Sequence, residues 1–547
     1  MTPSIPQCES WTWRETAGKE FSQRHWQALH LTPATIIKSN RARTVSRLCI
    51  DAIDVHVKYC RPVGIRAWMR ECLRPAKAIL EYRNLIRLQQ LGIPTLTPLA
   101  AASAARIGPA DSMLVTRSEA DARTLGDFLE KQLPTLAATE QTICRQRLAR
   151  GLGVLLAQII AVGVCHDDMH PGNILLNWTG AKPSFQLLDV HDVRFDQSVA
   201  AAIRSIVHLN RWFILRATRS DRLRCWQSLK NELHRRRITV PMDARQVEAA
   251  TVRSNTSLWR GRQAVCCSTN RRFQKFSVGD YRGFAVRSVS IDEIRSVIAR
   301  AGHTGDDMKV IKHSRSSTVV ELHCFIAGEM RRCILKRFRI ESWRDRLRSV
   351  FRPSACIRSW RNGHGFRASL LPTPQLFAGW QEHRFGLPGD GYLLQELVPG
   401  VSLHECLREL QQLPVHESLD KKRQAIEAIA RFVRDMHDRG WSHRDLKAGN
   451  LLVEWREGTP IIHVVDLVGA RLLGRIGHSR RQKDIARLNA SFLDVSVITR
   501  SDRLRFLSAY EQWGVRGGLG WKRNWKSLSK LGQSKQEKNR RLGRVLA

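Results

Sequence analysis

The stretch from Trp441 to Val453 gathers several polar side chains that could do chemistry together. It reads W-S-H-R-D-L-K-A-G-N-L-L-V, and the polar residues of interest are His443, Asp445, Lys447 and Asn450. A second apolar run follows and ends in Asp466. Phosphoryl transfer from a nucleotide needs one carboxylate that orients or deprotonates the acceptor hydroxyl, and it needs an amide and a second carboxylate that hold metal ions. The spacing predicts these roles for Asp445, Asn450 and Asp466.

The same pattern occurs a second time, earlier in the chain. His166, Asp168 and Asn173 precede an apolar strand, and a further strand ends in Asp189. An offset of 277 residues separates the His, Asn and final Asp positions of the two sets. The run from 37 to 48 likewise resembles 311–322, and T-R-S-D-R-L-R recurs unchanged. A near-constant offset over so long a stretch indicates tandem duplication of one domain.

Composition sets the broad class of the protein. A chain of 547 residues with 43% hydrophobic residues is long enough for two or more domains, each with its own core. The net charge of +40 favours polyanionic partners such as anionic lipid headgroups or phosphorylated glycolipids, although a compositional bias toward Arg would have the same effect. No specific nucleic-acid partner is predicted, because any protein this basic binds DNA non-specifically.

Cysteine usage and the N-terminus indicate the compartment. The 13 cysteines are scattered without a C-x-x-C motif, which fits neither a zinc site nor a disulfide framework. The N-terminus has no secretory signal, and the longest apolar stretch, 152–165, is too short to cross a bilayer. We therefore expect a buried helix there and a cytoplasmic protein, peripheral at the inner face of the membrane.

The repeat predicts a domain plan. Two kinase-like domains are expected at 31–240 and 291–520, after an N-terminal extension at 1–30. Residues 241–290 are rich in Arg, Ser and Thr and predict a basic linker or connecting helix. Residues 521–547 predict a basic tail, either a solvated end or an anchor for anionic membrane.

Each copy resembles the protein-kinase-like fold, an α+β architecture with a β-rich small lobe and a mainly helical large lobe. H-R-D-L-K-x-x-N at 443–450 matches the catalytic loop of protein kinases. Within that superfamily the chain looks most like the lipopolysaccharide kinases of the Kdo/WaaP type, on L-G-I-P-T at 91–95, L-P-T-P at 371–374 and D-L-V-G-A-R at 466–471. The first copy, H-D-D-M-H-P-G-N, also resembles aminoglycoside phosphotransferases.

The resemblance implies an ATP- and Mg²⁺-dependent kinase that acts on a lipopolysaccharide-core sugar or another envelope glycolipid at the cytoplasmic membrane face. Asp168 and Asp445 would be the catalytic bases, with Lys447 beside the second base and with His166 and His443 supporting the loops. The metal ligands would be Asn173, Asp189, Asn450 and Asp466. The nucleotide-binding residues would be Lys58, Glu81, Lys336, Glu396, Ser316 and Ser317.

Both copies depart from the kinase pattern. Neither has a G-x-G-x-x-G loop, so the phosphates must be approached without glycine. The first copy keeps Glu81 to pair with Lys58, whereas Ser359 aligns with Glu81 in the second copy. The second copy has Asp484, which fits the buried helix acid that braces the catalytic loop, and the first has Ser205 there.

Two other functions remain open. Lys447 favours a Ser/Thr-type protein kinase, but Asp466 and Asp484 are only eighteen residues apart and no A-P-E follows, which leaves little room for a peptide-binding segment. A tandem pseudokinase that binds polyanions is the third hypothesis, although both copies retain the Lys, Asp, Asn and Asp set. If only one copy is active, the intact H-R-D-L-K motif favours the second.

Overall fold

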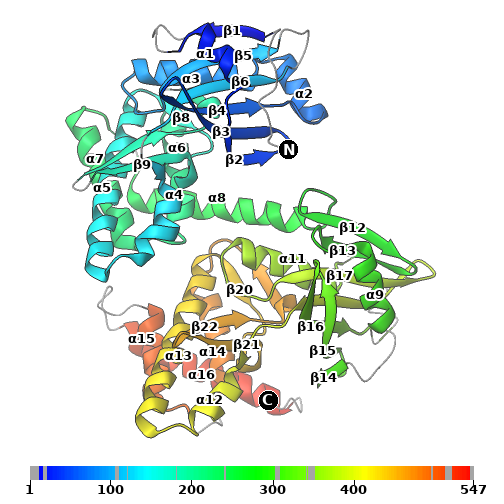
Figure 1. Cartoon of the computed structure of the whole chain (residues 1–547). Helices are drawn as coiled ribbons and strands as arrows, with labels where there is room; N and C mark the ends of the chain where they lie inside the picture. The colour runs from blue at the N-terminus through cyan, green and yellow to red at the C-terminus, as the bar shows by residue number, and fades with distance from the viewer. Residues whose placement is uncertain are drawn as a thin grey trace. The chain divides into compact units, whose positions relative to one another are not determined.

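The chain forms two compact units, Met1–Ser254 and Asn255–Ala547, each with a small sheet-containing lobe and a larger helical lobe (Figure 1). This predicted α+β, two-domain architecture is confirmed. The computed structural model describes residues 11–15, 21–104, 110–119, 121–179, 182–196, 198–239, 242–301, 308–340, 342, 346, 352–493, 497–511 and 520–541.

The small lobe of the first unit is built on a six-stranded antiparallel sheet with strand order β1-β5-β6-β4-β3-β2. Its strands are β1 (Trp11–Glu15), β2 (Thr35–Asn40), β3 (Arg43–Ile50), β4 (Ile53–Cys60), β5 (Pro98–Ala104) and β6 (Ser112–Arg117), and its helices are α1 (Gln23–Ala28), α2 (Ile65–Cys72) and α3 (Lys77–Gln90). On β4, Val55, Val57 and Tyr59 alternate into the core. Because side chains alternate along a strand, Lys58 lies on the opposite face, where α3 presents Glu81.

The large lobe of the first unit packs its helices around a short β region. Its elements are β7 (Arg123–Thr124), α4 (Leu125–Asp127), η1 (Phe128–Gln132), η2 (Leu133–Thr135), α5 (Ala138–Ala161), β8 (Val164–His166), η3 (Pro171–Asn173), β9 (Ile174–Thr179), β10 (Lys182–Leu187), η4 (Val190–Asp192), β11 (Val193–Phe195), α6 (Val199–Phe213), α7 (Arg219–Arg235) and α8 (Ala244–Val265). The apolar stretch at 152–165 is the buried second half of α5 and then β8, as expected.

The small lobe of the second unit has a seven-stranded sheet of order β12-β13-β17-β18-β16-β15-β14. Its strands are β12 (Phe273–Val278), β13 (Tyr281–Val286), β14 (Met308–His313), β15 (Ser317–Ile326), β16 (Glu329–Phe338), β17 (Leu376–Arg384) and β18 (Leu387–Glu396), and its helices are α9 (Ile291–Ala301) and α11 (Ala355–Ala368). Lys336 pairs with Val319 in this sheet, and Lys58 pairs with Val45 in the first. The two lysines therefore occupy equivalent positions.

The large lobe of the second unit repeats the plan of the first. Its elements are β19 (Val401–Ser402), α12 (Leu403–Leu410), α13 (Val415–Asp438), β20 (Trp441–His443), η5 (Ala448–Asn450), β21 (Leu451–Arg456), β22 (Thr459–Val464), η6 (Leu467–Gly469), β23 (Ala470–Leu472), α14 (His478–Ala490), α15 (Arg500–Glu511) and α16 (Gly520–Arg541). No helix in the described part of the chain is both long and apolar enough to span a bilayer.

Three of the expected flanking segments contribute elements of their own to the two units. The predicted extension at 1–30 contributes β1 to the first sheet and the buried Phe21 and Trp26 to its core. The predicted linker at 241–290 contains α8 and then the hairpin β12–β13, whose Phe273 and Phe276 are buried. The predicted tail contains α16, which packs on α14 and buries Leu528.

Candidate active sites

In the second unit, two short connections bring the predicted catalytic residues together. β20 ends at His443, and the loop after it carries Asp445 and reaches Asn450 in η5. β21 and β22 then form a hairpin that returns the chain to Asp466. Asp466 adopts the left-handed conformation, with φ 59° and ψ 61°, which is unusual for a residue other than glycine. A backbone held in this sparsely populated region indicates a position fixed by its surroundings.

His443 is fully buried and links the two connections. Its Nδ1 accepts a hydrogen bond from the Asp445 backbone N–H at 3.3 Å, so its Nε2 carries the proton and donates to the Asp466 carbonyl at 3.1 Å. Burial lowers the pKa of His443 and keeps the ring neutral. The supporting role predicted for this histidine is therefore consistent with its contacts.

Asp445 is held by its neighbours but remains open to solvent. The side-chain amide of Asn450 donates to the Asp445 carbonyl at 2.8 Å and to its carboxylate at 3.3 Å. Lys447 Nζ lies 3.5 Å from the same carboxylate, which is 58% exposed. An accessible carboxylate beside a cation is suited to receive an acceptor hydroxyl.

Asp484 supports the loop that carries Asp445, as the sequence predicted. It is fully buried in α14 and accepts hydrogen bonds from the Ser442 hydroxyl at 2.6 Å and from the His443 backbone N–H at 3.1 Å. Arg487 pairs with its other oxygen at 2.7 Å. In the first unit the hydroxyl of Ser205 takes the place of this carboxylate and accepts from the His166 N–H at 3.0 Å.

Lys336 projects from β16 onto Asp466, with its Nζ 2.7 Å from Oδ1 and 4.9 Å from the centre of the Phe338 ring. Burial raises the pKa of Asp466, but Lys336 outweighs this effect and holds the pKa below its usual value. Ser359 is buried on α11 where the first unit has Glu81, and its hydroxyl has no hydrogen-bond partner among the described residues. Asp466 and Phe338 are thus the partners of Lys336 that the sequence left unidentified.

The remaining predicted nucleotide residues of the second unit lie in two places. Ser316 and Ser317 lie at the β14–β15 turn, where Ser317 is 3.2 Å from the hydroxyl of Ser314. Glu396 ends β18, and its carboxylate accepts from the Gln375 backbone N–H at 3.2 Å. Ser317 and Glu396 make these contacts within the protein itself, and the part of Ser316, Ser317 and Glu396 in nucleotide binding stays a prediction.

The first unit repeats the loop geometry. His166 Nε2 lies 3.2 Å from the Leu188 carbonyl, and Asn173 donates to the Asp168 carbonyl at 3.0 Å. Lys58 pairs with Glu81 at 2.6 Å and with Asp189 at 2.7 Å. The Lys–Glu pair that the sequence predicted is therefore formed in this unit.

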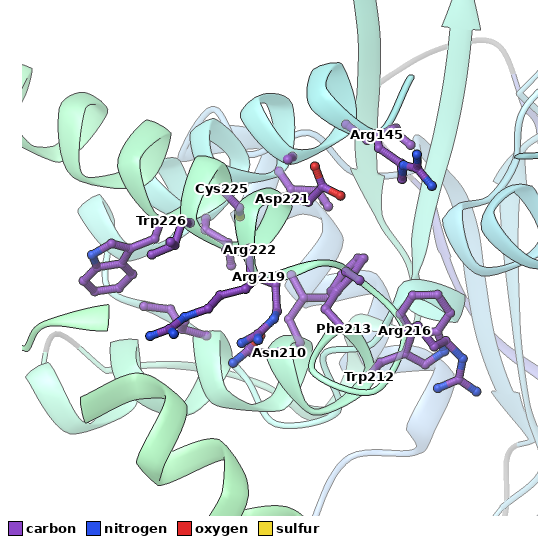
Figure 2. A pocket seen from close by; sticks show the side chains of 18 of the residues that line it. Arg145, Asn210, Trp212, Phe213, Arg216, Arg219, Asp221, Arg222, Cys225 and Trp226 are labelled. Carbon is purple, nitrogen blue, oxygen red and sulfur yellow. The ribbon is translucent and has the colours of Figure 1, made fainter. Parts of the chain in front are cut away.

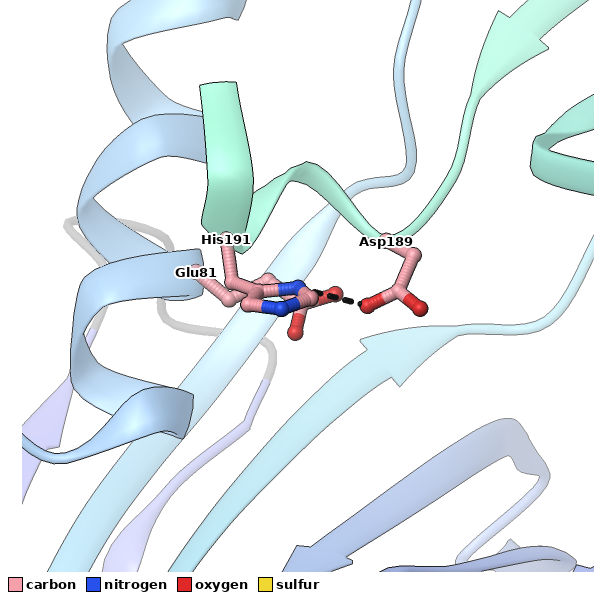
Figure 3. A group of neighbouring side chains, drawn as sticks. All are labelled: Glu81, Asp189 and His191. Carbon is pink, nitrogen blue, oxygen red and sulfur yellow. Dashed lines mark ion pairs between the residues drawn. The ribbon is translucent and has the colours of Figure 1, made fainter. Parts of the chain in front are cut away.

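Two basic side chains that were not predicted from the sequence also contact Asp189. Arg43, from the β2–β3 hairpin, lies 2.8 Å from Oδ2, and His191 Nδ1 lies 2.7 Å from Oδ1 (Figure 3). Burial raises the pKa of Asp189, but hydrogen bonding to His191 and the charge of Lys58 outweigh it and hold the pKa far below its usual range. An alignment of the two copies could have revealed Arg43 and His191 as differences, because Ser317 and Val468 occupy the equivalent positions in the second unit.

The donor sets differ in how well they fit a metal ion. Mg²⁺ prefers a few oxygen ligands and keeps several waters. In the second unit, Asp466 Oδ2 pairs with no described cation and Asn450 contacts Asp445 only through its amide nitrogen, so carboxylate and amide oxygens remain for a metal. In the first unit, the oxygens of Asp189 are already paired with Lys58 and Arg43, although Glu81, Asp189 and His191 lie close enough together to hold a metal ion and the amide oxygen of Asn173 is not used on Asp168.

A large cavity lies in the large lobe of the first unit, apart from the catalytic loop. Its volume is about 770 Å³, and its wall is mostly apolar, with arginines that include Arg145, Arg216 and Arg222 (Figure 2). Helices α5, α6 and α7 line it, and none of the predicted site residues is among its lining. A smaller cavity of about 160 Å³ occurs among the corresponding helices of the second unit, where Leu528 of α16 contributes to the wall.

The geometry agrees with what comparisons with known proteins find. The model of the lipopolysaccharide kinase (Kdo/WaaP) family matches residues 63–204 and 306–510, which together make up more than half of the chain. The chain therefore belongs to the lipopolysaccharide kinase (Kdo/WaaP) family. This result confirms the resemblance drawn from the sequence motifs.

Several relatives carry names that specify a substrate. Lipopolysaccharide core heptose(I) kinase WaaP of Pseudomonas aeruginosa is 35% identical over 120 residues, which are 21% of this chain and 44% of that protein. The protein of the same name from Escherichia coli is 30% identical over 158 residues, 28% of this chain and 58% of the relative. The chain thus spans about half the length of these curated relatives.

Two further matches are a protein kinase and a solved structure. Putative ribosomal protein S6 kinase alpha-2 of Caenorhabditis elegans is 37% identical over 82 residues, 15% of this chain and 10% of that protein. A solved structure of WaaP in complex with acyl carrier protein is 17% identical and covers 44% of this chain and 97% of its own, with a TM-score of 0.34.

Proposed function

We propose that this protein transfers the terminal phosphoryl group of ATP to a sugar hydroxyl of the lipopolysaccharide core and that the second unit performs the reaction. One observation carries the proposal. Asp445 is accessible, held by Asn450 and braced through the loop by Asp484, and it lies on the same loop assembly as the Lys336–Asp466 pair. These are the parts that a kinase needs for positioning and for electrostatic stabilisation.

The chain's own residues define the chemical step. The Asp445 carboxylate accepts a hydrogen bond from the acceptor hydroxyl and takes its proton as the phosphoryl group is transferred. Lys336 contacts the nucleotide phosphates, and Lys447 stabilises the negative charge of the transferred group. Asp466 and Asn450 would hold Mg²⁺, which would neutralise charge on the phosphate oxygens.

The acceptor is proposed from the names of the relatives together with the charge of this chain. Two relatives are heptose(I) kinases of the lipopolysaccharide core, so a heptose hydroxyl is the first acceptor to test. Lipopolysaccharide is an anionic amphiphile, and a net charge of +40 favours contact with such a molecule and with an anionic membrane surface. We place the reaction at the cytoplasmic face of the membrane, with ATP as the phosphoryl donor.

A Ser/Thr-type protein kinase is the second candidate. Lys447, two residues after the catalytic Asp445, supports it, and so does the similarity to an S6 kinase over 82 residues. The chain from Asp466 to the start of α14 at His478 is short, which favours a small acceptor over a peptide. A polyanion-binding pseudokinase is the third candidate and predicts no phosphoryl transfer.

The test uses radiolabelled ATP, Mg²⁺ and the full-length protein with three acceptors: core lipopolysaccharide lacking heptose phosphate, the same glycan with phosphorylated heptose, and a generic protein substrate. We expect label on the first acceptor only, and Asp466→Asn should remove it. Label on protein alone would establish the second candidate, and label on no acceptor would contradict the kinase proposal.

A further inference from the structure

The two units surround their predicted metal-binding aspartates with different charges. Asp189 contacts two cationic side chains, Arg43 at 2.8 Å and Lys58 at 2.7 Å, and the imidazole of His191 at 2.7 Å. Asp466 pairs with one described cation, Lys336, at 2.7 Å. Figure 3 shows His191 beside Asp189, with Glu81 next to them. The difference lies directly at the position where a kinase holds its metal.

Equivalent positions in the two copies account for this difference. Because Val45 pairs with Lys58 and Val319 pairs with Lys336, the hairpin register makes Ser317 the counterpart of Arg43. The shared offset at Asp189 and Asp466 makes Val468 the counterpart of His191. Two groups that can carry positive charge in the first unit are thus replaced by neutral groups in the second.

Arg43 is positioned by the turn that precedes it. The Asn40 side-chain oxygen accepts hydrogen bonds from the backbone N–H groups of Ala42 and Arg43, both at 2.9 Å. This fixed turn directs the guanidinium onto Asp189, and its side chain is only 21% exposed. The guanidinium of arginine presents several N–H donors in a fixed geometry that suits phosphate. Arg43 lies on the β2–β3 hairpin, which is the position from which the glycine-rich loop of kinases covers nucleotide phosphates.

A divalent metal does not fit this arrangement. Glu81, Asp189 and His191 lie close enough together to act as metal ligands, but Asp189 Oδ1 contacts Lys58 and His191 and Oδ2 contacts Arg43, so a metal ion would have to displace these side chains. A metal would also compete with Arg43 and Lys58, which already pair with the carboxylates of Asp189 and Glu81. The same charges attract the phosphates of a nucleotide directly.

We propose that the first unit binds nucleotide phosphates without a divalent metal, through Arg43 and Lys58, and that it is a nucleotide-binding rather than a catalytic unit. The inference rests on the proposed function in one respect, since it takes ATP or ADP as the ligand. It assigns the two copies different tasks, metal-free nucleotide binding in the first and metal-dependent phosphoryl transfer in the second.

The test measures ATP binding by calorimetry on the full-length Lys336→Met variant, which weakens the second site, in EDTA and in Mg²⁺. We expect EDTA to leave the remaining affinity unchanged. When Arg43→Ser is added to Lys336→Met, we expect ATP affinity in EDTA to fall on the order of tenfold or more. The reason is that one charge-assisted contact to phosphate is lost. Arg43→Lys keeps the charge and should lose less, and melting curves without nucleotide check that each variant is folded.

The matched exchange variant is Arg43→Ser with His191→Val, which gives the first unit the residues of the second. Its ATP binding should become dependent on Mg²⁺. Binding by Lys336→Met that EDTA abolishes would overturn the proposal, and so would the absence of any binding by this variant. Phosphoryl transfer by the wild type is measured in a separate assay. If the kinase proposal fails, ATP binding in EDTA can therefore still be detected and the two proposals are tested independently.

A second, independent observation concerns the surface of α2. Five large apolar residues at this helix are strongly exposed: Val63 (44%), Ile65 (77%), Trp68 (54%), Met69 (61%) and Leu73 (88%). At helical spacing, Ile65, Trp68, Met69 and Leu73 share one side of the helix. Arg61, Arg70 and Arg74 are exposed around them. Figure 1 shows α2 at the edge of the first unit.

We infer that α2 inserts its apolar side into an anionic lipid surface. An exposed helix with Trp on its apolar side and arginines beside it has the composition of an interfacial membrane helix. The neighbouring arginines complement anionic headgroups, and the helix is too short to span a bilayer. The occupant proposed is the bilayer surface, and a protein partner is the alternative outcome.

Co-sedimentation of the full-length protein with vesicles of phosphatidylcholine alone or mixed with phosphatidylglycerol tests this inference. We expect binding to the mixed vesicles that falls several-fold in Trp68→Ser with Met69→Ser, because two buried apolar side chains are lost. The control pair Phe385→Ser and Val415→Ser removes exposed apolar residues of the second unit and should bind like the wild type. Equal binding by both double variants, or no binding by the wild type, would overturn the inference.

Discussion

At the scale of single residues, Asp484 and Ser205 show how one position distinguishes the two copies. Asp484 receives hydrogen bonds from the Ser442 hydroxyl and the His443 backbone and is also paired with Arg487. Ser205 offers one hydroxyl oxygen to the His166 backbone. A buried side chain with several hydrogen-bond partners holds the loop more firmly than a single hydrogen bond does.

We expect Asp484→Asn to lower kcat by roughly 10- to 100-fold with a small change in KM for ATP, because the loop that carries Asp445 loses its fixed geometry. The measurement is steady-state phosphoryl transfer. Ser205→Ala is the matched control and should leave kcat near that of the wild type. Equal losses in the two variants would contradict the assignment of catalysis to the second unit.

His364 gives a prediction for the pH dependence of stability. Burial, assisted by Arg367 and Arg272, lowers the pKa of His364 to about 3, from an ordinary value of 6.5. Below pH 6.5 the unfolded chain therefore binds a proton that the folded chain does not, and stability falls as the pH falls from 6.5 toward 3. Because of this residue, the free energy of unfolding should fall by roughly 1–2 kcal/mol between pH 7 and pH 5.

The measurement for His364 is the free energy of urea unfolding of the wild type and of His364→Phe at both pH values. The ring packs against Trp360 and Phe273, with centroid distances of 4.2 and 4.8 Å, so phenylalanine keeps the aromatic contacts. The variant should lose less stability on acidification than the wild type. An identical loss in both proteins would show that His364 is protonated in the folded state.

The residues that could be predicted from sequence are those with a fixed local order. His, Asp and Asn of each loop and the Asp after the next hairpin follow one another at short, regular spacing, and the structure brings each set together. Arg43 and His191 could not be found this way, because Arg43 reaches Asp189 across 146 residues of chain. Long side chains that cross between lobes leave no periodic signal.

At the scale of secondary-structure elements, helices α5 and α7 of the first unit pack closely at Gly153. A Cβ placed on Gly153 would lie 2.7 Å from the Cβ of Ser228 and 2.9 Å from the backbone nitrogen of Leu229. Backbone atoms cannot move away without separating the helices. The glycine therefore permits the approach that forms the core below the first catalytic loop.

We expect Gly153→Ala to destabilise the first unit by about 1–3 kcal/mol, the usual cost of overpacking. Gly261→Ala in α8 is the control, because no described atom lies within 4 Å of a Cβ placed there. This control should be neutral or should stabilise by roughly 0.5–1 kcal/mol through better helix propensity. Chemical denaturation measures both, and a stable Gly153→Ala protein would refute the close packing.

The strands β1, β12 and β13 were not predicted from the sequence because their local signals are weak. Arginine-rich turns around β12 and β13 obscured their alternating pattern, although Phe273, Phe276 and Ala285 are buried. β1 joins the sheet only by pairing with β5, a partner roughly ninety residues away in sequence. Strands at a sheet edge depend on such distant pairing, so their local sequence carries a weak signal.

At the scale of the whole molecule, a duplicated kinase-like unit has two copies with different charges at the same position. The repeat itself was readable from the constant offset, and so was the α+β fold of each copy. The different roles proposed for the two units could be predicted only in part, because they depend on three-dimensional contacts around Asp189 and Asp466. The central claim is that the second unit catalyses phosphoryl transfer and that the first does not.

The most direct test compares Asp445→Asn with Asp168→Asn in the full-length protein, with ATP, Mg²⁺ and heptose-containing core lipopolysaccharide. Each variant removes the proposed base from one unit and leaves the side-chain shape intact. We expect Asp445→Asn to lower the rate of phosphoryl transfer by about 100-fold or more, as loss of a general base does. Asp168→Asn should retain most of the activity, and the reverse ranking would contradict the account.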